Sequence, residues 1–147
     1  MANKDNPAIG ARFEILIQNY LRADGLLLER PFILEIGAFR EKRPHKFDMG
    51  SRENKIVIEC KSHGWTKGEN APSAKMSVWN EAMYYFYLTP RSFRKMLFFK
   101  KSMRNGKSLG KYYMERYLHL IPKDVELWEY CIDTNKAWCL YKQQVIY

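Results

Sequence analysis

The segment KIVIECKS, residues 55–62, is an apolar run that ends in charged residues. Its β-branched residues predict a strand, and side chains along a strand alternate between its two faces. The even-numbered residues then form a core face, whereas Val57, Glu59 and Lys61 share the opposite face. We therefore expect this opposite face to be the charged wall of a pocket. His63 continues it.

The periodicity of the remaining chain predicts the order helix, three strands, helix, strand, helix and hairpin. Apolar residues recur at helical spacing over residues 7–24, 73–88 and 108–119. Short β-rich runs between turn-forming residues predict strands near 31–37, 45–49, 55–62 and 94–101, and residues 125–142 predict two further strands around a turn. This order is typical of a mixed α/β layer architecture.

A length of 147 residues, 46% of them hydrophobic, predicts a single domain over residues 1–147 with one real core. The cysteines, Cys60, Cys131 and Cys139, are odd in number and show no CxxC spacing. We expect reduced core thiols rather than disulfides or a zinc site. The sequence shows no signal-peptide core and no apolar run of the roughly 18 to 20 residues that cross a bilayer. We therefore expect a cytoplasmic protein, able to associate with the nucleoid, without a membrane partner.

The net charge of +9 is concentrated in one segment. Residues 89–116 contain nine Lys or Arg residues and one Glu, interleaved with aromatic residues. Such a segment favours a polyanionic partner, because neutralised phosphates release counterions. A basic face kept only for solubility is the alternative, and an anionic membrane fits less well because no strongly amphipathic basic helix is evident. Trp65 could stack on nucleic acid. The basic residues expected to contact nucleic acid are His63, Lys67, Lys75, Arg94, Lys100, Lys101, Arg104, Lys107 and Lys111.

The spacing of Asp48 and Glu59 predicts that the two carboxylates lie close together. A four-residue loop over residues 51–54 would pair Gly50 with Lys55 and Asp48 with Val57. Asp48 would then lie diagonally across from Glu59, roughly 7 to 8 Å away. A loop one residue longer or shorter would turn Asp48 into the core.

Two converging, partly buried carboxylates repel each other, and a divalent cation would relieve this repulsion. Oxygen ligands favour Mg²⁺, and Mn²⁺ could replace it. The backbone carbonyl of Cys60 could add a ligand. Lys61 would orient or deprotonate an attacking water and stabilise charge on a phosphoryl group. The predicted reaction is the hydrolysis of a phosphodiester. A second ExK triplet, Glu53-Asn54-Lys55, lies in a polar turn and is interpreted as a solvated loop.

Asp48, followed eleven residues later by Glu59-x-Lys61 on the next strand, resembles the motif of the PD-(D/E)xK nuclease superfamily. The resemblance covers roughly residues 7–100 and implies a restriction-endonuclease-like core of helix, three strands, helix and strand, here followed by a C-terminal helix and hairpin. It implies that Asp48 and Glu59 are metal ligands and that Lys61 is the catalytic lysine. By the same resemblance, Glu14 on the first helix is an auxiliary acid that reaches the metal.

Two main hypotheses follow. The first is a Mg²⁺-dependent endonuclease that hydrolyses DNA in restriction, repair or junction resolution, and it would be a homodimer if it cuts both strands. The second is a noncatalytic nucleic-acid-binding module. A protein-interaction domain that uses its aromatic residues is a third interpretation, and it predicts no salt-dependent affinity for DNA.

Overall fold

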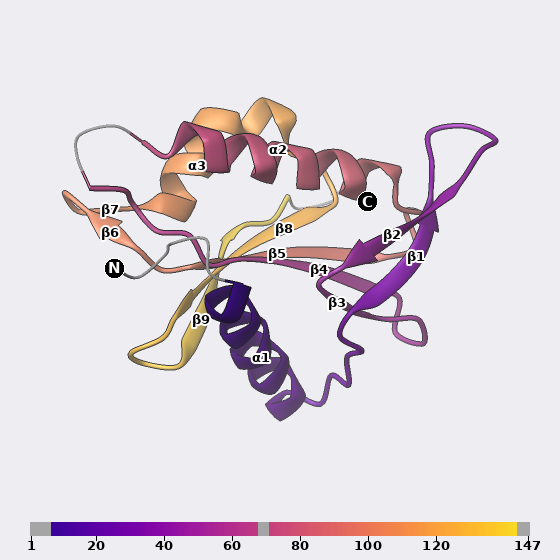
Figure 1. The fold of residues 1–147 in the computed structure, drawn as a ribbon, viewed down its shortest axis with the longest axis horizontal. Helices are drawn as coiled ribbons and strands as arrows, with labels where there is room; N and C mark the ends of the chain where they lie inside the picture. Colours follow the sequence, from indigo (N-terminus) through magenta and orange to yellow (C-terminus); the bar gives the residue numbers. More distant parts are fainter. Residues whose placement is uncertain (1–6, 68–70, 144–147) are drawn as a thin grey trace.

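A five-stranded mixed sheet forms the centre of the computed structural model, which describes residues 7–67 and 71–143 (Figure 1). The strand order is β3-β4-β5-β8-β9; β4, β5 and β8 are parallel, and the two edge strands are antiparallel to their neighbours. The chain therefore has the mixed α/β architecture that its sequence predicts. The strands of the central sheet are β3 (Met49–Ser51), β4 (Ile56–Lys61), β5 (Arg94–Lys100), β8 (Val125–Cys131) and β9 (Lys136–Tyr141).

Helices cover both faces of this sheet. Helix α1 (Pro7–Ala23) packs on one face, and helices α2 (Ser73–Leu88) and α3 (Leu109–Tyr117) lie over the other (Figure 1). Helix α2 connects β4 to β5, and α3 lies in the connection from β5 to β8. Both connections join parallel neighbouring strands and run in the same direction across the sheet. Because such crossovers are right-handed, both helices lie on one side. A short 3₁₀ helix, η1 (Leu118–Leu120), follows α3.

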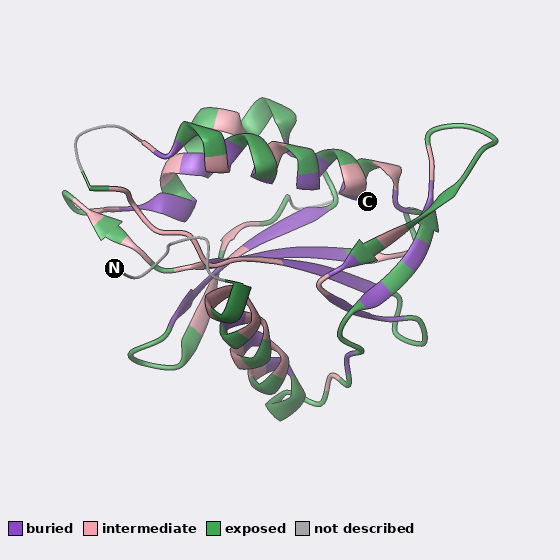
Figure 2. Cartoon of the chain, viewed as in Figure 1, coloured by how far each residue is buried: buried purple, intermediate pink, exposed green. Residues whose placement is uncertain are grey.

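The central strands are buried on both faces (Figure 2). Ile56 and Ile58 of β4 pack with α1, whereas Val57 packs with Trp79 and Met83 of α2. Val57 is fully buried, so the prediction that its whole face of β4 forms a charged wall was wrong. A parallel strand that is covered by helices on both faces buries nearly all of its side chains, so these are apolar. Polar residues are then confined to its carboxyl end.

A bend at Asp48 divides the predicted second strand into two. Strand β2 (Arg43–Phe47) pairs with β1 (Phe32–Ile36) in a separate two-stranded sheet, and β3 resumes beyond Asp48 beside β4. A further small hairpin, β6 (Met103–Arg104) and β7 (Lys107–Ser108), was not predicted. Its short strands carry no apolar alternation that would reveal them.

The register of β3 and β4 differs from the prediction by two residues. Ser51 pairs with Ile56, Gly50 with Val57 and Met49 with Ile58, so the four-residue loop comprises residues 52–55. The predicted pairs of Gly50 with Lys55 and of Asp48 with Val57 were wrong. Continuing the observed register by one residue places Asp48 directly opposite Glu59. A shift of two residues preserves the face on which each side chain lies.

The predicted long helices are confirmed, and their buried faces include the residues expected from periodicity. Cys60, Cys131 and Cys139 are all free thiols, but Cys139 is exposed, so its assignment to the core was wrong. It lies on β9, the strand at the edge of the central sheet. Among residues 7–67 and 71–143, no helix combines the length and hydropathy that crossing a membrane requires.

Candidate active site

Asp48 occupies the bend between β2 and β3 and points toward the carboxyl end of β4. Its Oδ2 accepts a hydrogen bond from the backbone N–H of Cys60 at 2.7 Å. The side chain is half-buried and does not enter the apolar core. The bend thus fixes one carboxylate at the point where β4 changes from apolar to polar residues.

Glu59 is the buried acid of the site, with 7% of its surface exposed. Burial and the charge and hydrogen-bonding proximity of Asp48 raise the pKa of Glu59 well above its ordinary value, and the Lys61 ammonium opposes that shift. A buried carboxylate without a full counter-charge holds its proton. The raised pKa favours the neutral form of the Glu59 carboxyl group.

Glu14 reaches the same site from α1. It lies between the buried helix residues Phe13 and Ile17, and its side chain is 21% exposed. Burial and the neighbouring Asp48 raise the pKa of Glu14 to about 7, although Arg30, at 3.9 Å, acts in the opposite direction. Three carboxylates from α1, the Asp48 bend and β4 therefore act on one another. Strand geometry predicted the approach of Asp48 to Glu59, whereas only the family resemblance implied a place for Glu14 beside them.

Lys61 lies two residues after Glu59 and therefore on the same face of β4. Its charge opposes the rise in the pKa of Glu59 and contributes to the lowered pKa of His45, which places its ammonium in the field of both groups. Cys60, between them, uses its N–H for Asp48, and burial raises the pKa of its thiol. A metal-binding role of the Cys60 carbonyl stays a prediction.

His45 is a neighbour of the site that the sequence analysis missed. Its Nε2 lies 3.5 Å from Oε1 of Glu59, and its ring stacks on Tyr85 of α2 with centroids 3.8 Å apart. Burial lowers the pKa of His45, which favours the neutral imidazole. The stack positions the imidazole beside Glu59. A lone histidine in an exposed hairpin strand carries no sequence signal for such a contact.

The basic residues predicted to contact nucleic acid are in unlike environments. Lys67, Lys101 and Lys111 are exposed. Arg94 pairs with Glu126 at 2.7 Å, and Lys107 pairs with Glu115 at 2.6 Å. The remaining predicted contacts are half-buried: His63, Lys75, Lys100 and Arg104.

Lys95, from the same basic segment, is fully buried beside Asp124. Part of the positive charge of residues 89–116 is thus used inside the protein. The predicted basic face is smaller than the sequence count of nine cations indicates.

The metal-binding potential of the site lies in its carboxylates. Within the described part of the chain, no group of three or more His, Cys, Asp and Glu side chains is arranged to hold a metal ion. Mg²⁺ is commonly bound by one or two carboxylates, with waters and substrate phosphate completing its shell. Asp48 and Glu59 fit this smaller requirement in donor chemistry, because each is an oxygen donor and their mutual repulsion favours a cation.

A comparison of the chain with protein-family models, with curated proteins and with solved structures finds no match.

Proposed function

We propose that this protein is a magnesium-dependent nuclease that hydrolyses phosphodiester bonds of DNA on a restriction-endonuclease-like core. The observation that carries the proposal is the convergence of Glu14, Asp48 and Glu59 beside Lys61. Burying like charges is unfavourable, so their arrangement calls for a cationic ligand. The order α1, β1 to β4, α2 and β5 supports the choice of core, because β2 and β3 together replace one predicted strand that is divided at Asp48.

Asp48 and Glu59 would hold Mg²⁺, which would supply charge stabilisation for the phosphoryl oxygens and activation of water. The hydrogen bond from Cys60 N–H orients the Asp48 carboxylate for such a role. Mn²⁺ has similar ligand preferences and would substitute.

Lys61 would stabilise the negative charge that develops on the phosphoryl group. Its ammonium already acts on Glu59, so a phosphate near the two carboxylates would be within its field. Glu14 is suited to proton transfer, because a pKa of about 7 lies near the operating pH that favours general acid–base catalysis. His45 would act as a positioning residue, because its stack on Tyr85 keeps the imidazole against Glu59, with Nε2 3.5 Å from Oε1.

The exposed cations of residues 89–116, apart from Arg94, which is paired with Glu126, would position DNA through its phosphates. Cleavage of both strands of a duplex would require two active sites, which a two-fold homodimer supplies. Both statements belong to the proposal and are tested with it.

The decisive experiment compares Glu59→Gln with Glu53→Gln on supercoiled plasmid, in EDTA and with titrated Mg²⁺ or Mn²⁺. Glu53 is an exposed residue of the other ExK triplet and is therefore the matched control. We expect metal-dependent cleavage by the wild type and by Glu53→Gln, and a loss of at least about 100-fold for Glu59→Gln, as for removal of one strong transition-state interaction. DNA affinity should stay within about twofold.

Intact plasmid with every metal would contradict the nuclease proposal. Salt-dependent DNA binding without cleavage would instead indicate a noncatalytic binding module. Equal activity of the two variants would remove Glu59 from the mechanism.

A further inference from the structure

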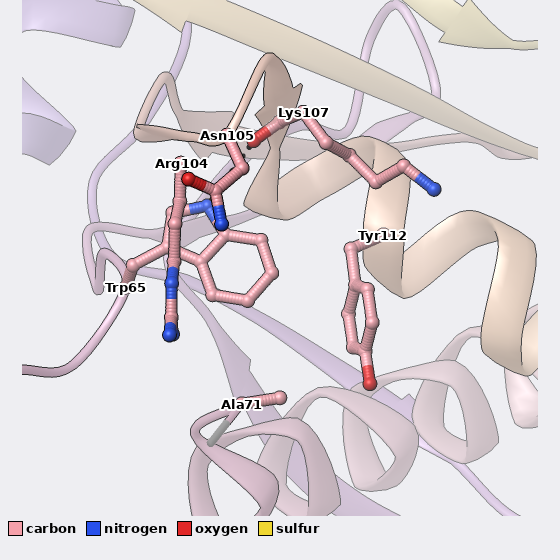
Figure 3. Close-up of a pocket in the computed structure, with 6 residues that line it drawn as sticks. All are labelled: Trp65, Ala71, Arg104, Asn105, Lys107 and Tyr112. Carbon is pink, nitrogen blue, oxygen red and sulfur yellow. Dashed lines mark hydrogen bonds between the residues drawn. The ribbon is translucent and has the colours of Figure 1, made fainter. Parts of the chain in front are cut away.

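A cavity of about 290 Å³ lies between the segment after β4, the β6–β7 hairpin and α3 (Figure 3). Sites for small molecules usually measure about 300 to 1,000 Å³, so this cavity suits one small planar group rather than two. The cavity lies apart from the carboxylate site, and none of the three carboxylates lines it. The residues that line it are Trp65, Ala71, Arg104, Asn105, Lys107 and Tyr112.

Two aromatic rings form fixed walls of the cavity. The backbone N–H of Trp65 donates to Ser102 Oγ at 3.0 Å, and its indole N–H donates to the Lys107 carbonyl at 3.3 Å. The Tyr112 ring stands 5.2 Å from the indole at 63°. Because the indole is held from both its backbone and its ring nitrogen, it presents a preformed surface for stacking.

Arg104 supplies hydrogen-bonding capacity beside the indole. Its guanidinium lies over the Trp65 ring, 5.5 Å from the centroid. Its Nη1 is buried, and in the described part of the chain it has no hydrogen-bond partner. A buried donor without a partner is costly, so a ligand that offers an acceptor would be favoured. Lys107, in contrast, is paired with Glu115.

The cavity and the carboxylate site are close along the chain. Trp65 follows Lys61 by four residues, so their Cα atoms lie at most about 14 Å apart. A strand of DNA advances about 3.4 Å per nucleotide in its double-helical form, so this limit corresponds to about four nucleotides. Val57, which shares a face of β4 with Glu59 and Lys61, packs against the same core as Trp65, under α2 and α3, so this face of β4 and the cavity lie on one side of the sheet.

We propose that this cavity receives one unpaired nucleobase of the nucleic-acid strand whose phosphodiester lies at Lys61. The base would stack on Trp65 or Tyr112 and accept a hydrogen bond from Arg104 Nη1. The inference rests on the proposed nuclease function for the identity of the strand and adds a substrate class, namely single-stranded or flapped DNA. A base that stays paired within a duplex could not enter.

The test measures the binding of a fluorescein-labelled 12-nucleotide single strand and of the matched duplex by anisotropy in EDTA, where no cleavage occurs. Trp65→Leu removes the stacking surface, Trp65→Phe retains a ring, and Tyr87→Ala removes an exposed ring outside the cavity. We expect about tenfold weaker single-strand binding for Trp65→Leu, as for one lost base–aromatic stack, and changes below about twofold for the other two variants. Duplex binding should change by less than about twofold throughout.

A series of single strands, each with one abasic site at a different position, refines the test. The strand that lacks the base bound in the cavity should bind the wild type and Trp65→Leu equally, whereas the other strands should still bind the wild type more tightly. Arg104→Met is a second variant, and its folding is checked with that of Trp65→Leu by thermal unfolding. Equal losses on single strand and duplex, or no loss on the single strand, would overturn the inference.

The two proposals fail separately. Cleavage without any selective effect of Trp65 or Arg104 would leave the nuclease and remove the base pocket. Weaker binding of the variants to the single strand alone, without metal-dependent cleavage by the wild type, would support the base pocket and remove the nuclease proposal. Absence of binding to every nucleic acid would overturn both.

Discussion

At the scale of single residues, charge alone does not separate a binding residue from a structural one. Arg91 and Arg94 are three residues apart in the basic segment and both are exposed, yet Arg94 makes two hydrogen bonds to Glu126, at 2.7 and 2.9 Å. Glu126 is buried, with 5% of its surface exposed. Arg94 therefore satisfies a buried carboxylate on the neighbouring strand β8.

The first prediction is that Arg94→Ala acts on stability rather than on DNA binding. Loss of the guanidinium removes two hydrogen bonds to the buried Glu126 carboxylate and leaves the one from the Trp128 indole N–H, which should lower the free energy of unfolding by about 1 to 3 kcal/mol. Arg91→Ala, the control, should change it by less than about 0.5 kcal/mol. Urea unfolding measures both values. A larger loss of DNA affinity for Arg94→Ala than for Arg91→Ala, with unchanged stability, would contradict this assignment.

The second prediction concerns the pH dependence of the same pair. Burial acts to raise the pKa of Glu126, but the Arg94 hydrogen bond and charge outweigh it and lower the pKa below its ordinary value of 4.5. A lowered pKa in the folded state stabilises the protein above the unfolded-state pKa, and this contribution disappears as the pH falls through the folded-state value. The stability difference between wild type and Glu126→Gln should therefore be largest near pH 7 and should shrink below pH 4.5. A stability difference between wild type and Glu126→Gln that grows as the pH falls would contradict this prediction.

At the scale of the elements, the β1–β2 hairpin and the central sheet meet at Gly50. A Cβ at Gly50 would lie 2.5 Å from the Ile56 carbonyl oxygen and 2.6 Å from the Phe32 ring. Strand β3 thus fits between β1 and β4 only without a side chain at this position. Because Asp48 lies two residues away, this close contact also positions the candidate metal ligand.

The third prediction compares two glycine substitutions. Gly50→Ala should lower the free energy of unfolding by about 1 to 3 kcal/mol through overpacking, and it should reduce cleavage by displacing Asp48. Gly10→Ala, inside α1, meets no atom within 4 Å and should stabilise the protein by about 0.5 to 1 kcal/mol, because Ala favours the helix. Thermal unfolding and the plasmid assay measure both effects. Equal stability of the two variants would contradict the tight contact at Gly50.

The sequence predicted whole elements well and their junctions poorly. Residues 73–88 were predicted as a helix and form α2 over the same range, because its buried face repeats at helical spacing. The bend at Asp48, the two-residue change in register and the β6–β7 hairpin were missed. The bend and the register depend on contacts between distant segments, such as Gly50 with Phe32, which local periodicity does not encode. The β6–β7 hairpin is local, but its two-residue strands are too short to show a period.

The part of the site that follows from the alternation of side chains along β4 and from the position of Asp48 could be predicted. Glu59 and Lys61 share a face by strand geometry, and the parity of a four-residue loop kept Asp48 on the correct side. His45 could not be predicted, since its place beside Glu59 depends on Tyr85, forty residues later in α2. The pairing of Arg94 with Glu126 required the neighbourhood of β5 and β8, which only the fold provides.

At the scale of the whole molecule, the net charge of +9 is partly neutralised inside the fold. Lys95 and Arg94 face Asp124 and Glu126 between β5 and β8, whereas Lys101 is exposed beside the Trp138 ring, 5.1 Å from its centroid. The carboxyl end of β5 therefore carries cations toward solvent. Lys100, the half-buried last residue of β5, and the exposed Lys101 that follows it are these cations.

The fourth prediction is that Lys100→Ala with Lys101→Ala weakens duplex binding at every sequence. Each phosphate contact contributes about 0.9 to the slope of log affinity against log salt, so the double variant should reduce that slope by about 1.8. Arg22→Ala with Lys136→Ala removes two exposed cations outside residues 89–116 and should leave the slope within about 0.5 of the wild type, about half of one phosphate contact. Anisotropy titrations at several salt concentrations measure the slopes. Similar reductions in the two double variants would show that net charge, rather than the end of β5, attracts DNA.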